Sequence, residues 1–255
     1  MVHEGPVLPL LRRVAHPCYM YAAARSVALL QSRWGGLFRD FLATAEAVAK
    51  DRGLSPNDTI WICTFANSQF GEDFGPSIEE SPFAQAVKAS EGGTVLVVDR
   101  SGGSLTRMWC ALELKLTIDY NKRLEVYTPS GRVGSKRVTS GPLVEQIAGF
   151  DVTRCGASED ADRRQILNYL VNPSRECEGL VVDDDGKLVV SNGWQKQLAS
   201  TERVPDAADA RRRADGSLEY VFEATLVAKH ATELDAVSEL VRSKVTAMTA
   251  GLDER

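Results

Sequence analysis

The amino-acid sequence predicts an α/β fold, in which a parallel sheet carries helices on both faces. Four runs of apolar residues are too short for helices and do not alternate with polar residues, a pattern typical of strands buried on both faces. Helical patterns separate these runs, and such an alternation produces parallel strands joined by right-handed crossovers. The predicted strands are 26–30, 59–65, 94–98 and 124–127, with a weaker fifth candidate at 150–154.

Five helices are expected between and after these strands. The first, over 37–49, repeats apolar residues at helical spacing. It should stop at Gly53, because glycine readily adopts the left-handed conformation found at helix C-termini. The other helices are predicted at 82–89, 106–118, 142–148 and 160–170.

The chain is expected to have three parts: an N-terminal extension (1–24), the α/β domain (25–172) and a small α+β C-terminal extension (173–255). The polar segment that begins at Asn172-Pro173 marks the second boundary. The extension should begin with a hairpin over 180–190, because Asp-Gly stands between two apolar runs. A charged loop (204–217), a strand (218–228) and a helix (233–248) are expected to follow.

Composition argues against several classes of function. The 255 residues include 30 Lys and Arg against 35 Asp and Glu, which gives a formal net charge of −5. Nucleic acids and anionic membranes bind basic faces, so neither is expected as a partner. No apolar run reaches the ~18 residues of a membrane span, and a signal peptide is not recognised, so we expect a cytoplasmic protein. Three His, and five Cys without CxxC spacing, predict no metal site.

Polar segments that contain glycine or serine follow the four predicted strands. Ligands of open α/β sheets bind beyond the carboxyl ends of the strands, where backbone N–H groups can hold a phosphate. Turns after strands are often rich in Gly and Ser, so a ligand site is only one of two interpretations. Neither GxGxxG nor GxxxxGK[ST] occurs in these segments, which disfavours a Rossmann dehydrogenase and a P-loop NTPase. The candidate ligand-binding residues there are Ser32, Arg33, Trp34, Asn67 and Ser101.

The helix predicted over 106–118 contains the candidate catalytic residue, Glu113. Trp109, Glu113 and Thr117 are four residues apart and form one stripe beside the apolar stripe of this helix. A carboxylate at the margin of an apolar face, next to an indole, can act as an acid or base or stabilise a developing cation. The alternative is that Glu113 is an ordinary solvated or ion-paired helix residue.

The chain resembles the Toll/interleukin-1 receptor (TIR) domain family. The strand TVLVV is followed by a serine-containing segment and a helix that carries W-C-x-x-E-L, from Trp109 to Leu114. The segments SRWGG, WICTFANSQ and DADRRQILNYL are similar to a divergent TIR-like group found in dinoflagellate and other protist proteins. The resemblance covers about 25–172 and implies a TIR/flavodoxin-like sheet.

The resemblance implies two possible functions. Many TIR domains cleave NAD⁺ at the nicotinamide–ribose bond with the glutamate that corresponds to Glu113, so NAD would be a substrate and no cofactor is expected. Others are signalling modules that self-associate without catalysis. The family's usual first strand is replaced here by SVALLQSRWGG, which alters the ligand contacts expected of Ser32, Arg33 and Trp34. Trp109 is a further candidate contact. A third alternative is a domain that binds a small nucleotide without turnover.

Overall fold

The chain forms two compact units in a computed structural model. The first unit is Met1–Cys155 together with Ser238–Arg255, and the second is Gly156–Val237. The domain boundaries expected at 24 and 172 stay predictions. The structure describes residues 26–31, 37–55, 58–66, 77–99, 102–135, 138, 141–158, 160–176, 180–182, 188–190, 211–212, 218–219 and 227–250.

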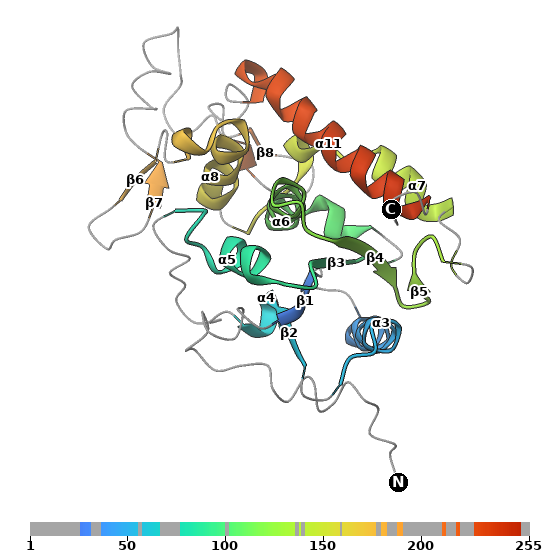
Figure 1. Ribbon diagram of the computed structural model, residues 1–255. Coiled ribbons are helices and arrows are strands. Elements are labelled where there is room, and N and C mark those ends of the chain that lie inside the picture. The colour runs from blue at the N-terminus through green and yellow to red at the C-terminus, as the bar shows by residue number, and fades with distance from the viewer. Residues whose placement is uncertain are drawn as a thin grey trace, which may run out of the picture. The chain divides into compact units, whose positions relative to one another are not determined.

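A five-stranded sheet lies in the first unit (Figure 1). The strands β2, β1, β3 and β4 pair in parallel in that order, and β5 pairs antiparallel with β4 at one edge. The fold is therefore a mixed α/β fold, as predicted, and the antiparallel edge strand was not predicted. The bounds are β1 (Ser26–Gln31), β2 (Thr59–Ile62), β3 (Thr94–Val97), β4 (Leu124–Thr128) and β5 (Gly131–Arg132).

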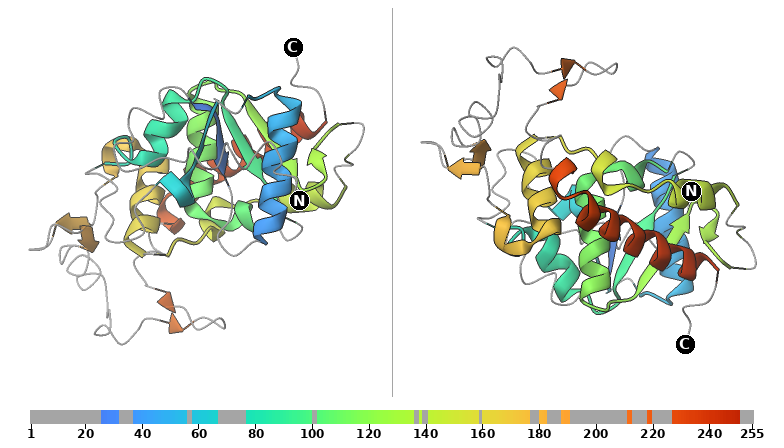
Figure 2. Two further views of the ribbon diagram at one scale, coloured as in Figure 1. Left: turned by 90° about the horizontal axis from the view of Figure 1, so that it is seen from below. Right: turned by 90° about the horizontal axis from the view of Figure 1, so that it is seen from above.

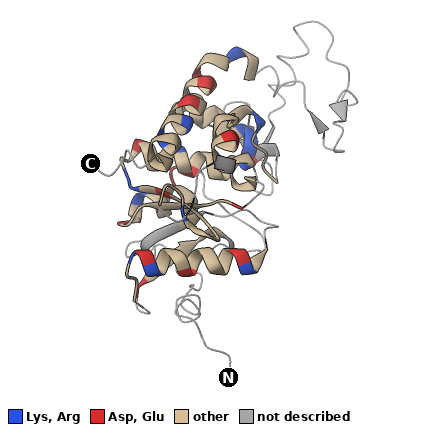
Figure 3. Cartoon of the chain, turned by 90° about the vertical axis from the view of Figure 1, so that its right-hand side faces the viewer, with Lys and Arg blue, Asp and Glu red and all other residues tan. Residues whose placement is uncertain are grey.

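Helices connect the strands and flank the sheet. Helix α3 lies on one face and α6 on the other, and α11 lies on the same side as α6 (Figures 1 and 3). Figure 2 shows the molecule from two opposite sides. Helix α3 lies in front of the strands in the view from below, and α11 lies in front of them in the view from above. The described helices with residues in the first unit are α3 (Phe38–Asp51), α4 (Cys63–Ala66), α5 (Pro82–Ala89), α6 (Met108–Asp119), α7 (Gly141–Ala148) and α11 (Ala231–Thr249).

Two of the strands predicted for the α/β domain were wrong in part or whole. The strand predicted over 59–65 ends at Ile62, and the chain continues directly into the short helix α4. The candidate strand at 150–154 is instead the 3-10 turn η2 (Val152–Arg154). The carboxylate of Asp151 accepts a hydrogen bond from the backbone N–H of Thr153 at 2.9 Å. Such a local bond holds the backbone in a turn and competes with pairing in a sheet.

In the described residues, the second unit has the helix α8, two short hairpins and the first turns of α11. The predicted hairpin over 180–190 is confirmed, because Leu180 pairs with Val190 and Val182 with Leu188 in antiparallel register. The strand predicted over 218–228 is described only at its start, and residues 227–229 are helical. The described elements of this unit are α8 (Asp160–Val171), η3 (Pro173–Arg175), β6 (Leu180–Val182), β7 (Leu188–Val190), β8 (Arg211–Arg212), β9 (Leu218–Glu219) and the first turns of α11.

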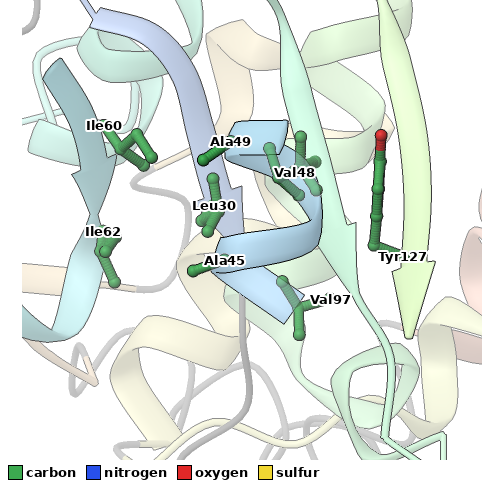
Figure 4. Close-up of a cluster of buried hydrophobic side chains, with 9 residues drawn as sticks. Leu30, Ala45, Val48, Ala49, Ile60, Ile62, Val97 and Tyr127 are labelled. Atoms are coloured by element: carbon green, nitrogen blue, oxygen red, sulfur yellow. The ribbon is translucent and has the colours of Figure 1, made fainter. Parts of the chain in front are cut away.

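A hydrophobic core fills the space between α3 and the sheet (Figure 4). Its helix residues recur at the three- and four-residue spacing of a buried helix face, and its strand residues alternate along each strand. Trp61 and Leu96, which lie between core residues in the sequence, are also buried. Burial of successive residues explains why the strands read as continuous apolar runs. The core residues are Leu30, Ala45, Val48, Ala49, Ile60, Ile62, Val95, Val97 and Tyr127.

Helix α3 ends at the predicted glycine. Gly53 has a φ of 62°, in the left-handed region. The N–H of Leu54 donates to the carbonyl of Ala49 at 2.8 Å, and the N–H of Gly53 donates to that of Lys50 at 3.2 Å. These two bonds are those of a Schellman motif, and they satisfy carbonyls that the end of a helix leaves open.

A buried ion pair joins the end of α3 to β4. Arg52 Nε and Nη2 donate to Glu125 Oε2 at 2.9 and 2.5 Å, and both side chains are less than a tenth exposed. Arg52 Nη1 also donates to the carbonyl of Gly92 at 3.0 Å, in the turn before β3. The other carboxylate oxygen, Oε1, accepts from Arg123 at 2.7 Å and from Arg132 on β5 at 3.4 Å. Glu125 thus connects four segments where parallel strands begin.

The last turns of α11 close the first unit. The backbone N–H of Val152 donates to Ser238 Oγ at 3.0 Å, and Arg242 Nη1 donates to the carbonyl of Phe150 at 2.7 Å. Gly134, which follows β5, approaches the C-terminal end of α11. It has a φ of 81°, and a Cβ at this position would lie 2.7 Å from the carbonyl oxygen of Thr249. Only glycine fits this close approach without strain.

Removing Arg52 should strongly destabilise the protein. Arg52→Ala leaves the carboxylate of Glu125 buried without its main partner, and such a loss typically lowers the free energy of unfolding by about 3–5 kcal/mol. Arg39→Ala is the matched control, because Arg39 pairs with Asp40 while 81% exposed and should change this free energy by less than about 1 kcal/mol. Urea unfolding of both variants measures the difference, and equal effects would contradict the structural role of Arg52.

The contribution of Glu125 to stability should disappear in acid. Burial acts to raise the pKa of Glu125, but the charges and hydrogen bonds of Arg52 and Arg123 outweigh it and hold the pKa below the ordinary value of 4.5. The unfolded chain therefore binds more protons between those two values, and stability falls as pH decreases through this window. We expect the gap in unfolding free energy between wild type and Glu125→Gln to shrink below pH 4.5, as followed by urea unfolding at several pH values. A gap independent of pH would contradict this.

Candidate functional site

Hydrogen bonds after β3 direct the chain into α6 where parallel strands end. Ser104 Oγ donates to the carbonyl of Val97 at 2.6 Å, and the N–H of Gly103 donates to Asp99 Oδ1 at 3.2 Å. Gly102 has a φ of 68°, which a glycine adopts without strain. The turn continues as η1 (Gly103–Thr106), and α6 begins at Met108. The W-C-x-x-E segment therefore starts at the edge of the sheet where ligands bind in open α/β folds.

Glu113 is buried more deeply than its position in the sequence suggests. The stripe of Trp109, Glu113 and Thr117 lies on α6, but Glu113 is only 2% exposed and is not at the margin of a buried face. Thr117 Oγ1 donates to the carbonyl of Glu113 at 2.6 Å and lies 2.6 Å from Thr94 Oγ1 on β3. Most residues of α6 are buried, and Glu113 is one of them, whereas Trp109 and Lys115 keep partial exposure.

Trp109 belongs to an aromatic group built from three elements. Its ring stacks on that of Phe83, with centroids 4.2 Å apart and an angle of 25° between the planes. Phe83, from α5, also meets the ring of Trp61 on β2 edge to face at 6.1 Å. Trp109 keeps partial exposure, whereas Phe83 and Trp61 are buried. Phe83 and Trp61 were not among the predicted site residues, because a cluster from separate elements leaves no periodic signal.

Cys110 is a buried residue of α6, and its thiol has a perturbed pKa. Burial raises the pKa of Cys110 well above its usual value, and the negative charge of Glu113 raises it further. Cys63 and Cys155 act in the same direction, while the positive charge of Arg107 acts against them. The net effect favours the neutral thiol of Cys110.

Only two of the predicted site residues lie in the part of the chain that the structure describes. Glu113 and Trp109 are one helical turn apart on α6. Their expected convergence with the strand-end residues stays a prediction. In the described ranges, no group of three or more His, Cys, Asp or Glu is arranged to hold a metal ion. The predicted ligand residues outside the described residues are Ser32, Arg33, Trp34, Asn67 and Ser101.

Comparisons with known proteins add no relative. No family model, no curated protein and no solved structure matches the chain. None of the described helices is both long enough and apolar enough to cross a membrane. The resemblance to TIR domains therefore rests on the motif residues of the sequence.

The Cys110 thiol should resist modification in the folded protein. The thiolate is the reactive form, so a raised pKa leaves little of it near pH 8, and the side chain is also buried. We expect a maleimide to label Cys63, which is only half-buried, faster than Cys110, and unfolding in urea to remove the difference. Mass spectrometry of the labelled peptides gives both rates. Fast native labelling of Cys110 would contradict the burial of this helix.

Proposed function

We propose that the chain is a TIR-like α/β domain that cleaves NAD⁺ at the nicotinamide–ribose bond. The parallel pairing of β2, β1, β3 and β4, with α6 after β3, supports this proposal. The observation that carries the proposal is a buried carboxylate, Glu113, one turn below a partly exposed indole, Trp109. Both side chains come from the helix that begins beyond the carboxyl ends of the strands.

The proposed chemistry breaks one bond and consumes one water. The bond between ribose C1′ and nicotinamide N1 breaks, and its electron pair leaves with nicotinamide. Water supplies a hydroxyl group to C1′ and releases a proton, which yields ADP-ribose. Positive charge develops on the ribose as the bond lengthens, and a carboxylate stabilises that charge more strongly in apolar surroundings than in water. Glu113 is proposed to supply this negative charge, and Trp109 to flank the reacting end of the substrate.

The depth of Glu113 also favours a second function. A side chain that is 2% exposed without substrate has the surroundings of a structural residue. A TIR-like module that associates with other copies and does not turn over NAD⁺ is therefore the second candidate. Binding of a small nucleotide without turnover is the third, and an equilibrium binding measurement separates it from the second.

Replacing Glu113 tests the catalytic proposal. Glu113→Gln keeps the shape and removes the charge, so nicotinamide release should fall on the order of 10²-fold or more if Glu113 stabilises the reaction. Asp119→Asn is the matched control: it removes a carboxylate from the same helix, where Asp119 pairs with Lys115 near the surface, and should leave the rate unchanged. The assay measures free nicotinamide by chromatography at high protein concentration.

Each outcome of this assay decides between the candidates. Undiminished release by Glu113→Gln, with the far-UV circular dichroism of the wild type, would remove Glu113 from the mechanism. An absence of release by the wild type would leave the non-catalytic module as the better account. Equal losses in Glu113→Gln and Asp119→Asn would indicate a general effect on α6 rather than chemistry.

A further inference from the structure

Phe83 is the buried side chain on which the indole of Trp109 rests. The residue is 7% exposed, and its ring stacks on the indole with centroids 4.2 Å apart and an interplanar angle of 25°. Aromatic pairs in this offset-stacked range attract each other beyond the burial of their surface. The edge-to-face contact with Trp61 at 6.1 Å fixes the phenyl ring from another direction. Phe83 is therefore held from the sheet and in turn supports Trp109.

The start of α5 holds Phe83 rigidly. Ser81 is the N-cap of the helix: its Oγ accepts from the N–H of Ala84 at 3.2 Å and donates to the carbonyl of Ile78 at 2.6 Å. Pro82 occupies the first helical position, where its fixed φ favours the helix. Phe83 follows directly, with Ala84 also buried. The capped helix start fixes the backbone that carries Phe83, and the contacts with Trp61 and Trp109 hold its ring.

Trp109 lies where it can cover Glu113. Side chains of an α-helix lean towards its N-terminus, so the side chain of Glu113 extends over the turn that carries Trp109. The two residues are four apart, which makes them neighbours on one face. Trp109 keeps partial exposure while Glu113 is 2% exposed, so the indole is nearer to solvent than the carboxylate.

We propose that Phe83 is a positioning residue that holds the indole of Trp109 over Glu113 and keeps water from that carboxylate. The link to catalysis rests on the proposed function of Glu113. The shielding itself does not, because access to a carboxylate can be measured without any turnover. Phe83 acts through Trp109 and is not expected to touch the substrate.

Chemical labelling of Glu113 tests the shielding directly. The folded protein is treated with a water-soluble carbodiimide and an amine, and the modified fraction of Glu113 is measured by mass spectrometry. Phe83→Leu keeps an apolar side chain but removes the flat ring, so labelling of Glu113 should rise severalfold. Phe83→Tyr keeps the ring and should restore the low labelling of the wild type. Phe83→Met provides a second variant without a ring, in case Phe83→Leu does not fold.

Phe150→Leu is the matched control. It makes the same substitution at a phenylalanine that is 3% exposed and outside the aromatic contacts around Trp109. Labelling of Glu113 in this variant should equal that of the wild type. Equal labelling in wild type, Phe83→Leu and Phe83→Met would overturn the proposal. An equal rise in the Phe83 and Phe150 variants would also overturn it, because general loosening would then explain the result.

Turnover separates this inference from the proposed function. If the wild type releases nicotinamide, Phe83→Leu should lower kcat with little change in KM, and Phe83→Tyr should recover it. If the wild type releases none but labelling rises only in the variants without a ring, the proposed function fails and the positioning role of Phe83 stands. Release by the wild type together with unchanged labelling would leave the proposed function and remove the role of Phe83.

Discussion

The carboxylate of Glu125 is the point at which the beginning of the sheet is tied together. It receives Arg52 from the end of α3, Arg123 from the start of β4 and Arg132 from β5. Parallel strands cannot be joined by tight turns, so their order depends on long crossovers that return each chain segment to the same edge. The ion pair of Arg52 and Glu125 holds the end of α3 against β4 at this edge. Separating the two side chains would leave a buried charge without its partner, which costs a large part of the free energy of folding.

Close backbone packing supports the same edge. Gly93 has a φ of 76°, and a Cβ there would lie 2.0 Å from the carbonyl oxygen of Arg123, which accepts the N–H of Thr94 at 2.8 Å. The start of β3 and the start of β4 are thereby held at one distance. These contacts hold the edge where the parallel strands begin, and the opposite edge, where α6 begins, carries the candidate site residues of that helix. Such a division is usual for α/β folds, in which ligands bind beyond the carboxyl ends of the strands.

The parts of the fold that could be predicted are those that depend on the local pattern of residues in the sequence. The four main strands were predicted because burial on both faces makes them continuously apolar, and Gly53 because only a left-handed residue ends α3 in that way. Contacts between residues that are far apart in the sequence were not predicted. Arg52 and Glu125 are 73 positions apart, and the two-residue strand β5 is too short to show any period. For the site, spacing predicted the stripe on α6, but the burial of Glu113 and its aromatic support depend on neighbouring elements.

The hydrogen bond from Val152 to Ser238 joins residues 86 positions apart and has a consequence for synthesis on the ribosome. Synthesis runs from the N-terminus, so the whole of Gly156–Val237 is made before the segment that completes the first unit. The entropy of closing so long a loop is modest, since each doubling of length adds only about 0.6 kcal/mol. The order of synthesis is the larger constraint. The apolar surfaces that Val241 and Val245 help to bury stay exposed on the nascent chain until these residues have been made. The first unit is therefore completed only after the second unit has been synthesised.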